Sequence, residues 1–325
     1  MPCYNNEKTI AETLKSLQEQ SYPFWEGVFV DDGSSDATPH IIKKFSQTDD
    51  RFKYFKRDTE KRGGSICRNI GLAHCTGEYV MFLDADDLLT PGCLLTRLNK
   101  IDSSNYDFIV FTTATFGSEG VLNSHAFPTV NSMDKDVYKY LYAGGQAVWH
   151  TSSTLLRKSF VDLLGGFDTR FKRLQDVEFH FRAIVESKER YEVVSGGVYD
   201  SLYRITESEG VKYKKFQDSL ASYMMMSEKM SDYIQKGLLI KNKHLSKAYL
   251  LLCTRYVRTL ALLKEGGIIS ASDERFDWVN YTFLERRHRL IINRIKGALI
   301  KPGRCLRLCR FIDYLLRKCI VGRCC

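Results

Sequence analysis

The sequence predicts an α/β fold with a mostly parallel sheet, and two patterns carry that prediction. Short apolar runs typical of buried strands alternate with segments whose apolar residues repeat at helical spacing. Two of these runs, residues 27–30 and 79–83, end abruptly in acidic residues. Because ligands bind beyond the carboxyl ends of parallel strands, we expect both acidic tips to line a ligand site.

The expected elements follow one another in a regular order. Apolar runs predict strands at 27–30, 52–55, 79–83 and 108–111, and helical spacing predicts helices through 10–17, 41–45, 66–73, 213–234 and 245–263. Pro39 falls in the first turn of the second helix, where proline is tolerated, and Gly77 can close the third. Within residues 91–130, a helix precedes the strand at 108–111 and a polar loop follows it.

The run at 79–83 delivers Asp84, Asp86 and Asp87 to its tip. Carboxylates cannot lie inside a covered sheet without partners or a bound cation, so we expect them in a cleft at its edge. Their hard oxygen atoms suit Mg²⁺ or Mn²⁺, which is commonly shared with substrate phosphates. The alternative is a solvated acidic turn that caps the helix beginning near Thr90 and Pro91. The spacing alone leaves both interpretations open.

Four motifs together carry a resemblance that none of them carries alone. They are Pro2-x-Tyr4-Asn5, Val30-Asp31-Asp32-Gly33-Ser34-Ser35-Asp36, Gly63-Gly64 leading to Arg68-Asn69-x-Gly71, and Gly77-Glu78-Tyr79 running into Leu83-Asp84-Ala85-Asp86-Asp87. In this order they resemble the family-2 glycosyltransferases, from the first residue to roughly Arg204. The resemblance implies the GT-A fold, a Rossmann-like sheet that is flanked by helices and binds a nucleotide sugar.

The resemblance also implies a set of site residues. Pro2, Tyr4 and Asp32 would line the nucleoside pocket. Asp84 and Asp86 would hold ribose, diphosphate and a Mg²⁺ or Mn²⁺ ion, and UDP is the nucleotide expected from the family. The full set of expected substrate-binding residues is Pro2, Tyr4, Asn5, Glu7, Asp32, Gly64, Arg68, Asp84, Asp86 and Gln175.

The opening of the chain departs from the family pattern. The family has a strand just before its Pro-x-Tyr-Asn turn, and a strand needs about 5–6 residues, more than Met1 supplies. That strand lies inside the sheet, so its loss would leave its neighbours without hydrogen-bond partners. Either Met1 is a misassigned start or the sequence is a damaged copy. The intact appearance of the other motifs favours a misassigned start.

A second informative region runs from Trp149 to Arg182. In the family, a Gly-Gly-Phe-Asp turn precedes an acidic pair whose aspartate is the catalytic base. Here the turn is 165–168 and the pair is Gln175-Asp176, in which glutamine replaces the frequent glutamate. A helix N-terminus would help to keep Asp176 ionised and able to accept a proton. The alternative is that Asp176 only caps that helix.

For three further side chains in this region, Glu178, His180 and His150, the sequence does not decide between a role at the site and a purely structural role. Glu178 and His180 are two residues apart on a helix, so they do not share a face, and either can be solvated. His150 can contact donor or acceptor, although a lone histidine is more often structural. Met224, Met225 and Met226 are expected to be packing residues rather than a site.

Composition limits the location of the protein. The chain has 325 residues, of which 44% are hydrophobic, and no apolar run approaches the roughly 20 residues that span a bilayer. The N-terminus lacks a basic region followed by an apolar core, so we expect a cytoplasmic protein. Its ten cysteines are then expected as reduced thiols rather than as disulfides or a zinc site.

The net charge of +9 is concentrated in residues 286–325, which hold twelve Lys or Arg residues and one acidic residue, Asp313. Apolar residues repeat at helical spacing on both sides of Pro302-Gly303: Ile291, Ile295 and Leu299 before it, and Leu308, Phe311, Ile312, Leu315 and Cys319 after it. This pattern suits peripheral contact with an anionic membrane, here the cytoplasmic face of the inner membrane. The alternative is a helix that packs on its own domain with a solvated basic face. Nucleic-acid binding is not expected, because no recognition module accompanies the charge.

These observations combine into one prediction of organisation and activity. We expect a GT-A domain at 1–212, with a nucleotide-binding half at 1–100 and an acceptor half at 101–212, then a helical extension at 213–285 and a basic amphipathic tail at 286–325. The predicted activity is metal-dependent, inverting transfer of a sugar from a nucleotide diphosphate to a hydroxyl of a surface glycan or a lipid-linked precursor. The alternatives are an inactive membrane-associated scaffold and a nucleotidyltransferase, which would release pyrophosphate.

Overall fold

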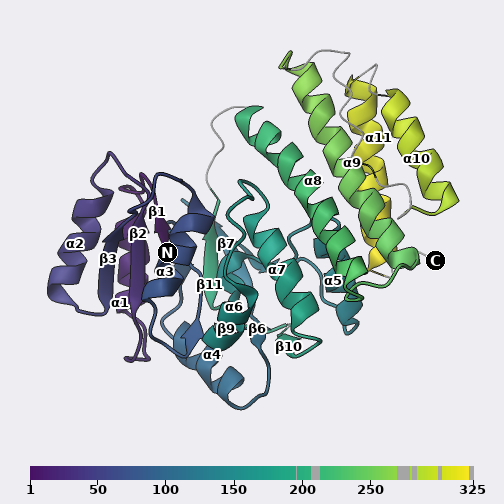
Figure 1. The fold of residues 1–325 in the computed structure, drawn as a ribbon. Coiled ribbons are helices and arrows are strands. Elements are labelled where there is room, and N and C mark those ends of the chain that lie inside the picture. The colour runs from purple at the N-terminus through teal and green to yellow at the C-terminus, as the bar shows by residue number, and fades with distance from the viewer. Residues whose placement is uncertain (195, 206–212, 269–278, 280–283, 299–301, 322–325) are drawn as a thin grey trace. The chain divides into compact units, whose positions relative to one another are not determined.

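The computed structural model describes residues 1–194, 196–205, 213–268, 279, 284–298 and 302–321. The chain folds into two compact units that interleave along the sequence. Unit 1 comprises Met1–Asn131, Val148–Thr169 and Glu186–Glu207, and unit 2 comprises Ser132–Ala147, Arg170–Val185 and Ser208–Cys325. Every strand of the described residues belongs to unit 1, whereas the described part of unit 2 is helical (Figure 1).

Unit 1 begins with a parallel sheet of order β1-β2-β3, formed by β1 (Pro2–Cys3), β2 (Gly27–Asp31) and β3 (Phe52–Lys56). The connecting helices are α1 (Ile10–Gln18), α2 (Thr38–Thr48) and α3 (Gly64–His74). The predicted strands at 27–30 and 52–55 and the three predicted helices are therefore confirmed. Gly77 does not close α3, because the helix ends at His74 and the next residue is extended.

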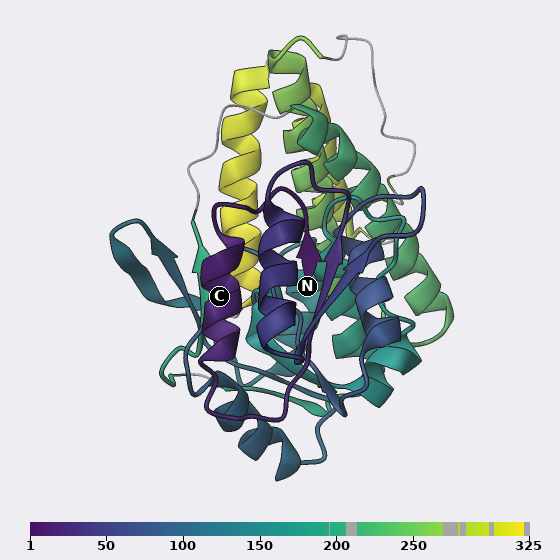
Figure 2. The ribbon, with the colours of Figure 1, turned by 90° about the vertical axis from the view of Figure 1, so that its left-hand side faces the viewer.

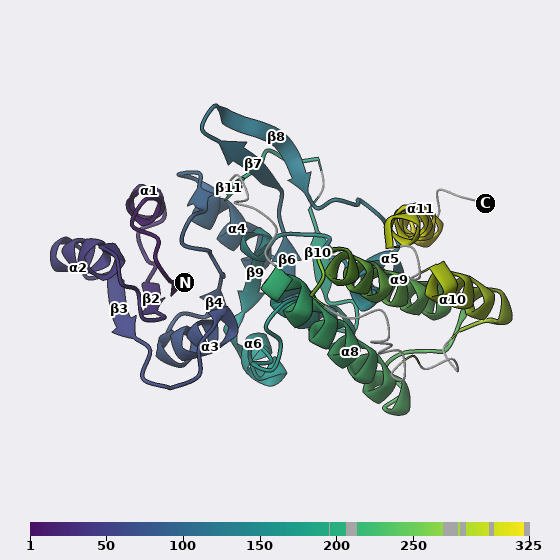
Figure 3. The same cartoon turned by 90° about the horizontal axis from the view of Figure 1, so that it is seen from above.

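Strand β2 is covered on both faces, as its continuous apolar sequence predicts. Successive side chains of a strand point to opposite faces, so Phe29 packs in the cluster of α1 and α2, with Leu14 and Ile42. Val28 and Val30 pack on the other face, in a cluster with Cys67 of α3. Figure 3 shows α1 and α2 on one side of this sheet and α3 on the other.

Two further sheets complete unit 1, and both are mixed. The first has the order β10-β6-β9-β4, with β4 (Tyr79–Val80), β6 (Phe108–Val110), β9 (Thr154–Arg157) and β10 (Tyr191–Val193). The second has the order β5-β11-β7-β8, with β5 (Leu88–Leu89), β7 (Thr113–Gly117), β8 (Gly120–Phe127) and β11 (Ser201–Arg204). Helices α4 (Cys93–Asp102) and α6 (Lys158–Leu164) and a short 3₁₀ helix, η1 (Thr151–Ser153), lie between these strands in the sequence.

Two expectations about these sheets are wrong. The strand expected at 79–83 is only two residues long, because β4 pairs with β9 through Tyr79 and Val80 alone and residues 81–83 form no ladder. The polar loop expected after residue 111 is instead the hairpin β7–β8. Most of β8 is exposed, so no buried apolar face marks it as a strand in the sequence. Figure 2 shows this hairpin projecting from its sheet.

Unit 2 is built around a buried helix. The unit contains α5 (Lys135–Ala143), α7 (Gln175–Glu186), α8 (Tyr213–Gln235), α9 (Lys243–Glu265), α10 (Arg286–Ala298) and α11 (Pro302–Ile320). The buried helix is α9, and α5, α8, α10 and α11 all pack against it. The segment Tyr249–Leu252 of α9 is almost entirely buried. Gly144 allows the close approach after α5, since a Cβ atom there would lie 2.7 Å from Leu251 Cδ2. The two long helices predicted at 213–234 and 245–263 are confirmed.

The basic tail packs on α9 through a face different from the predicted one. Cys305, Cys309 and Leu316 are buried on α11, and Ile292 and Ile295 are buried on α10. Phe311 and Leu315 of the predicted stripe are exposed, because the smaller cysteines occupy the inner face of α11. Leu299 lies outside the described residues, as does the side chain of Cys319. No helix in the described part of the chain is apolar over a length that would cross a bilayer.

Candidate active site

The loops that follow β1 and β2 are joined through side chains of the first motif. Asn5 has a φ of 52°, a left-handed conformation that asparagine tolerates. Its Oδ1 accepts from the backbone N–H of Ser35 at 2.9 Å, and its own N–H donates to Ser34 Oγ at 3.0 Å. Glu7 Oε2 accepts from the N–H of Ala37 at 3.1 Å. Asn5 and Glu7, both expected at the substrate, thus bind the neighbouring loop, while the Tyr4 side chain between them is 53% exposed.

Asp32 lies at the carboxyl end of β2 and holds the segment that leads into α3. Its Oδ1 accepts from Arg57 Nε at 2.6 Å and its Oδ2 from the N–H of Gly63 at 3.0 Å. Gly63 has a φ of 129°, which a side chain would make costly, and Gly64 is the first residue of α3. The glycine pair of the third motif therefore lies where the chain, bound to the Asp32 carboxylate through the N–H of Gly63, enters the N-terminus of α3.

Helix α3 directs Arg68 at the turn of residues 84–87, which follows β4 and is called the acidic turn below. Arg68 Nη2 donates to Asp84 Oδ1 at 2.6 Å, and its guanidinium carbon lies 5.2 Å from the centre of the Phe167 ring. Burial raises the pKa of Asp84, but attraction to Arg68 and His150 outweighs it and leaves that pKa below its ordinary value. Asp84 is therefore ionised at neutral pH.

Asn69, the residue after Arg68, fixes the Gly-Gly-Phe-Asp turn. Its Nδ2 donates to the Phe167 carbonyl at 2.8 Å, and its Oδ1 accepts from the Phe167 N–H at 2.8 Å. Gly166 has a φ of 70°, and a Cβ there would lie 2.6 Å from Asn69 Oδ1. The asparagine of the third motif and the second glycine of the turn are thus parts of one contact. The motifs by themselves indicated no role for Asn69.

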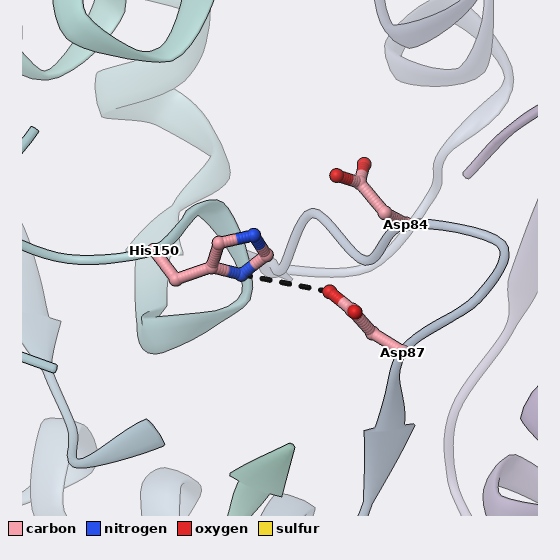
Figure 4. Close-up of side chains that lie close together, drawn as sticks. All are labelled: Asp84, Asp87 and His150. Carbon is pink, nitrogen blue, oxygen red and sulfur yellow. Dashed lines mark ion pairs between the residues drawn. The ribbon is translucent and has the colours of Figure 1, made fainter. Parts of the chain in front are cut away.

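The acidic turn places Asp84, Asp87 and His150 together (Figure 4). One ligand atom from each residue lies within 4.8 Å of the others. Asp87 is fully buried, and its Oδ2 lies 3.5 Å from His150 Nδ1. Burial, followed by repulsion from Asp84 and Asp86, raises the pKa of Asp87 well above its ordinary value.

Asp86, expected at the metal together with Asp84, is not part of that close group of described residues. It is half-buried, and burial followed by the charge of Asp84 raises its pKa. Arg204 binds the acidic turn through two hydrogen bonds. Its N–H donates to Asp87 Oδ1 at 3.0 Å, and its Nε donates to the Asp86 carbonyl at 2.8 Å. Arg204 thus pairs with neither carboxylate of this stretch through its guanidinium. Nothing in the sequence indicated the contact between Arg204 and Asp87, which joins residues 117 apart.

The chemistry of the donor set fits a divalent cation. Three carboxylates share one turn, and Asp84 is the one that has a guanidinium partner, Arg68. Burial, followed by repulsion within the turn, raises the pKa of two of the three carboxyl groups, and a cation would relieve that repulsion. Carboxylate oxygens suit Mg²⁺ and Mn²⁺, and His150 adds a nitrogen ligand.

In unit 2, Gln175 and Asp176 open helix α7. Leu174, which precedes them, has a φ of 57° and its carbonyl accepts from the N–H of Glu178 at 2.9 Å. Asp176 therefore lies within the first turn rather than before it. Among the described residues its half-buried carboxylate forms no hydrogen bond or ion pair within the chain. Gln175 Nε2 donates to the Lys172 carbonyl at 3.3 Å.

Glu178 and His180 are buried, so neither is the solvated residue that the sequence left open. The carboxylate of Glu178 forms ion pairs with Arg182 Nε at 2.6 Å and Lys229 Nζ at 2.7 Å. The centre of the His180 ring lies 5.7 Å from the centre of the Tyr142 ring. These contacts give Glu178 and His180 structural surroundings within unit 2.

Comparisons with known proteins identify the family of this chain and its relatives. The family model described as "Glycosyl transferase family 2" matches residues 1–164. EpsE of Bacillus subtilis (strain 168) is 28% identical over 246 residues, which cover 72% of this chain and 84% of EpsE. TarS of Staphylococcus aureus (strain MW2), a poly(ribitol-phosphate) beta-N-acetylglucosaminyltransferase, is 29% identical over 215 residues, which cover 65% of this chain but only 35% of TarS.

Solved structures share the fold. The S. aureus TarS 1-349 structure in complex with UDP-GlcNAc superposes with a TM-score of 0.61 at 19% identity, and the match covers 98% of this chain and 90% of that one. The mannosyltransferase PcManGT from Pyrobaculum calidifontis, in complex with GDP-Man and Mn²⁺, gives a TM-score of 0.54 at 18% identity. The match covers 98% of this chain and 84% of PcManGT. The GT-A fold with a helical C-terminal region is thereby confirmed.

Proposed function

The chain belongs to glycosyl transferase family 2, and on that premise we propose that it moves one sugar from a nucleotide diphosphate to a hydroxyl acceptor. UDP is the proposed nucleotide, because TarS was solved with UDP-GlcNAc and has a higher TM-score than PcManGT, which was solved with GDP-Man. The proposed acceptor is a surface polysaccharide or its lipid-linked precursor. The name of TarS, which specifies a poly(ribitol phosphate) acceptor, supports that class.

The acidic turn carries this proposal. Asp84 and Asp86 are the proposed ligands of a Mg²⁺ or Mn²⁺ ion, which when bound would act as a Lewis acid and offset charge on the departing diphosphate. Asp87 and His150 offer an alternative set of ligands together with Asp84. Arg68 holds Asp84 ionised and brings a cation to the same turn, where it can also attract the diphosphate. Tyr4, Asp32 and Gly64 are the proposed contacts to the nucleotide.

Asp176 is the proposed general base. An acceptor hydroxyl is a poor nucleophile at neutral pH, so a carboxylate that accepts its proton accelerates attack on the anomeric carbon. Asp176 lies in the first turn of α7, and among the described residues its carboxylate has no partner. A single displacement of this kind inverts the configuration at the anomeric carbon.

Calorimetric titration with UDP tests the donor site. We expect UDP to bind in Mn²⁺ and to lose most of its affinity in excess chelator and in Asp86→Ala, with weaker binding in Asp84→Asn. The exposed Asp58 supplies a matched control, and Asp58→Ala should bind as the unmodified chain does. Affinity that survives both chelator and Asp86→Ala would contradict the site. If His150→Gln loses affinity while Asp86→Ala keeps it, the ion belongs to the alternative set.

Product analysis tests the reaction type. A glycosyltransferase given a UDP sugar and acceptor releases UDP, whereas a nucleotidyltransferase releases pyrophosphate. Release of UDP that requires both the acceptor and the metal supports the proposal. Pyrophosphate as the product would overturn it.

The exposed face of α11 is the proposed membrane contact. Arg307, Arg310, Phe311 and Tyr314 are exposed on this helix, which combines basic and aromatic side chains. Anionic lipid attracts each basic residue near its surface, and aromatic side chains suit the interface. This face, which includes Phe311 and Leu315 of the predicted apolar stripe, supports peripheral contact with the cytoplasmic face of the inner membrane, although Ile295 of the stripe is buried in unit 2.

A further inference from the structure

Two thiols lie together inside unit 2, on the inner face of α11. Cys305 and Cys309 are four residues apart on this helix, and neither residue is exposed to solvent. Their Sγ atoms are 3.9 Å apart, and neither forms a disulfide. Helices α9 and α10 both pack against α11 (Figure 1), and Cys305 Sγ lies 3.8 Å from the carbonyl oxygen of Ile295 on α10. The proposed transfer reaction uses neither thiol, so the pair needs an explanation of its own.

The charges around the pair favour one thiolate but not two. The hydrogen bond from Cys309 lowers the pKa of Cys305 against the effect of burial, and Lys264 of α9 adds to that lowering. The same hydrogen bond, together with burial, raises the pKa of Cys309. Arg258 of α9 acts to lower that pKa, whereas Asp313 acts to raise it. A second thiolate therefore needs a further positive charge between the two sulfur atoms.

The spacing of the two residues does not suit a disulfide. Residues four apart on a helix have Cβ atoms about 5–6 Å apart, whereas a disulfide holds its Cβ atoms about 3.5–4.5 Å apart. A bond between Cys305 and Cys309 would distort α11 on the face that packs against α9. The pair is thus poorly placed for oxidation within an intact helix.

The same spacing suits a metal ion shared by both sulfur atoms. A thiolate binds such an ion at about 2.3 Å, so two thiolates around one ion lie up to about 4.6 Å apart. The observed separation of 3.9 Å falls within this limit. Zn²⁺ takes four ligands, but the described residues bring no third His, Cys, Asp or Glu ligand atom within 4.8 Å of both sulfur atoms. A soft ion that accepts two thiolates, such as Cu⁺, fits this donor set.

We propose that Cys305 and Cys309 form a site for the soft monovalent cation Cu⁺, which the two thiolates bind between successive turns of α11. Both thiols lose their protons to solvent as the two sulfur–copper bonds form, and no atom changes its oxidation state. The complex carries one negative charge, which Lys264 and Arg258 of α9 offset. Because the site needs the helical spacing of the two thiols, binding stabilises the folded form of unit 2.

Anaerobic titration with Cu⁺ against the coloured chelator bicinchoninate tests the site. Three cysteines near the C-terminus are first replaced by serine, so that their thiols do not compete for copper: Cys319, Cys324 and Cys325. We expect this background chain to bind one equivalent of copper that Cys305→Ser and Cys309→Ser each lose. Cys253→Ser removes another buried thiol, on α9, and should keep that equivalent. Because the thiols are buried, copper is added to the folded chain and, in parallel, during refolding from urea.

Thermal unfolding gives a second measurement of the same site. Bound copper should raise the Tm of the background chain as its concentration rises, because the ion binds the folded form. This increase should be absent from Cys305→Ser and retained by Cys253→Ser. Cys305→Ala and Cys309→Ala replace the serine variants if buried hydroxyl groups prevent folding.

Three results would contradict the proposal. Equal copper binding by all of the variants would overturn it, as would binding that occurs only with a loss of helical circular dichroism. Displacement of the copper by an equal concentration of Zn²⁺ would refute a site for a soft ion. Ready formation of a disulfide between Cys305 and Cys309 with oxidised glutathione, measured by mass spectrometry of the folded chain, would make the pair a redox couple instead. None of these measurements depends on sugar transfer, so they stand apart from the proposed function.

Discussion

Buried acidic side chains occur in both units, but the two units balance them differently. Glu178 of unit 2 is fully buried and forms ion pairs with Arg182 and Lys229, so two cations face one acid. The turn in unit 1 holds three acids, and one of them, Asp84, has a guanidinium partner. The pKa values of Asp86 and Asp87 are raised, first by burial and then by their neighbours. An excess of acid over base, rather than burial itself, indicates where a cation or a diphosphate-metal pair would bind.

The same contrast exists within helix α7. Asp176 and Glu178 are two residues apart, yet Glu178 has two partners, and the described residues give the Asp176 carboxylate none. A paired carboxylate is a poor proton acceptor, because its charge is already stabilised. The difference makes Asp176 the candidate base and Glu178 a structural residue, and substitution can test each role separately.

The largest expected effect is the loss of transfer in Asp176→Asn. A positioned general base contributes about 10²–10⁴ in rate, so single-turnover transfer should fall by that factor while UDP affinity stays nearly unchanged. Asp50→Asn, at an exposed position, is the control. Asparagine has nearly the same shape as aspartate but does not accept a proton, so a residue that only supported the helix would leave transfer nearly intact after this change. Near-normal transfer by folded Asp176→Asn would remove the base assignment.

The paired and buried Glu178 predicts an effect on stability, rather than on transfer, for Glu178→Gln. Removing the carboxylate leaves Arg182 and Lys229 without their shared anion, and breaking a buried pair costs about 3–5 kcal/mol. Urea denaturation should show this fall in the free energy of unfolding. Glu228→Gln on α8 changes an exposed glutamate and should shift it by less than about 0.5 kcal/mol. Equal stability of the two variants would show that the buried cluster is not what holds α7.

Glu26 gives a third kind of balance, in which backbone donors contribute. It accepts from Lys53 Nζ at 2.6 Å and from the N–H groups of Thr76 and Gly77. Burial alone would raise its pKa, but these donors lower it from 4.5 to about 2. Because the folded pKa is the lower one, the stabilisation is complete above pH 4.5 and is lost as the pH falls towards about 2.

The matching variant is Glu26→Gln, which should lose about 1–3 kcal/mol of stability at pH 7. It should also lack the part of the stability decrease that the unmodified chain shows between pH 4.5 and about 2. Thermal unfolding across this range measures both effects. If the variant and the unmodified chain lose stability in parallel below pH 4.5, Glu26 does not carry this dependence.

The smallest expected effect concerns the exposed charges of α11. Each basic residue near an anionic surface contributes roughly 1 kcal/mol, so Arg307→Gln with Arg310→Gln should weaken vesicle binding by about 30-fold at low salt. Vesicles that contain phosphatidylserine measure it by sedimentation, and neutral vesicles give the baseline. Lys236→Gln with Lys214→Gln on α8 removes the same charge elsewhere and should have little effect. A chain that ignores anionic vesicles at low salt would contradict the proposed contact.

The sequence predicts well the features that depend on neighbouring residues. Helices α1, α2, α8 and α9 were predicted because apolar spacing is local, and the motifs located the acidic turn. The features that it did not predict depend on distant pairing. Strand β8 is mostly exposed although its partner β7 is largely buried, and β4 is short because its length depends on which strands lie beside it. Arg204 reaches Asp87 across 117 residues, a contact that a single sequence does not reveal.

The sequence displays only part of the surroundings that allow Glu178 to be buried. Its partner Arg182 is four residues further along α7, a spacing that the sequence displays. The second partner, Lys229, comes from α8, 51 residues later, and only the packing of the helices identifies it. The sequence displays the spacing of the first pair, although no ion pair was predicted from it, and it does not reveal the second cation that offsets the cost of burying the acid.

The contact between Asn69 and Phe167 has a consequence for synthesis of the protein. The two residues are 98 positions apart, so the amide of Asn69 has no Phe167 backbone to bind until most of unit 1 has left the ribosome. Closing so long a segment costs chain entropy, which the pair of hydrogen bonds helps to offset. The turn that supports the Arg68 side chain through Phe167 is thus completed late, so a nascent chain that stops before residue 167 would carry the acidic turn without its full support.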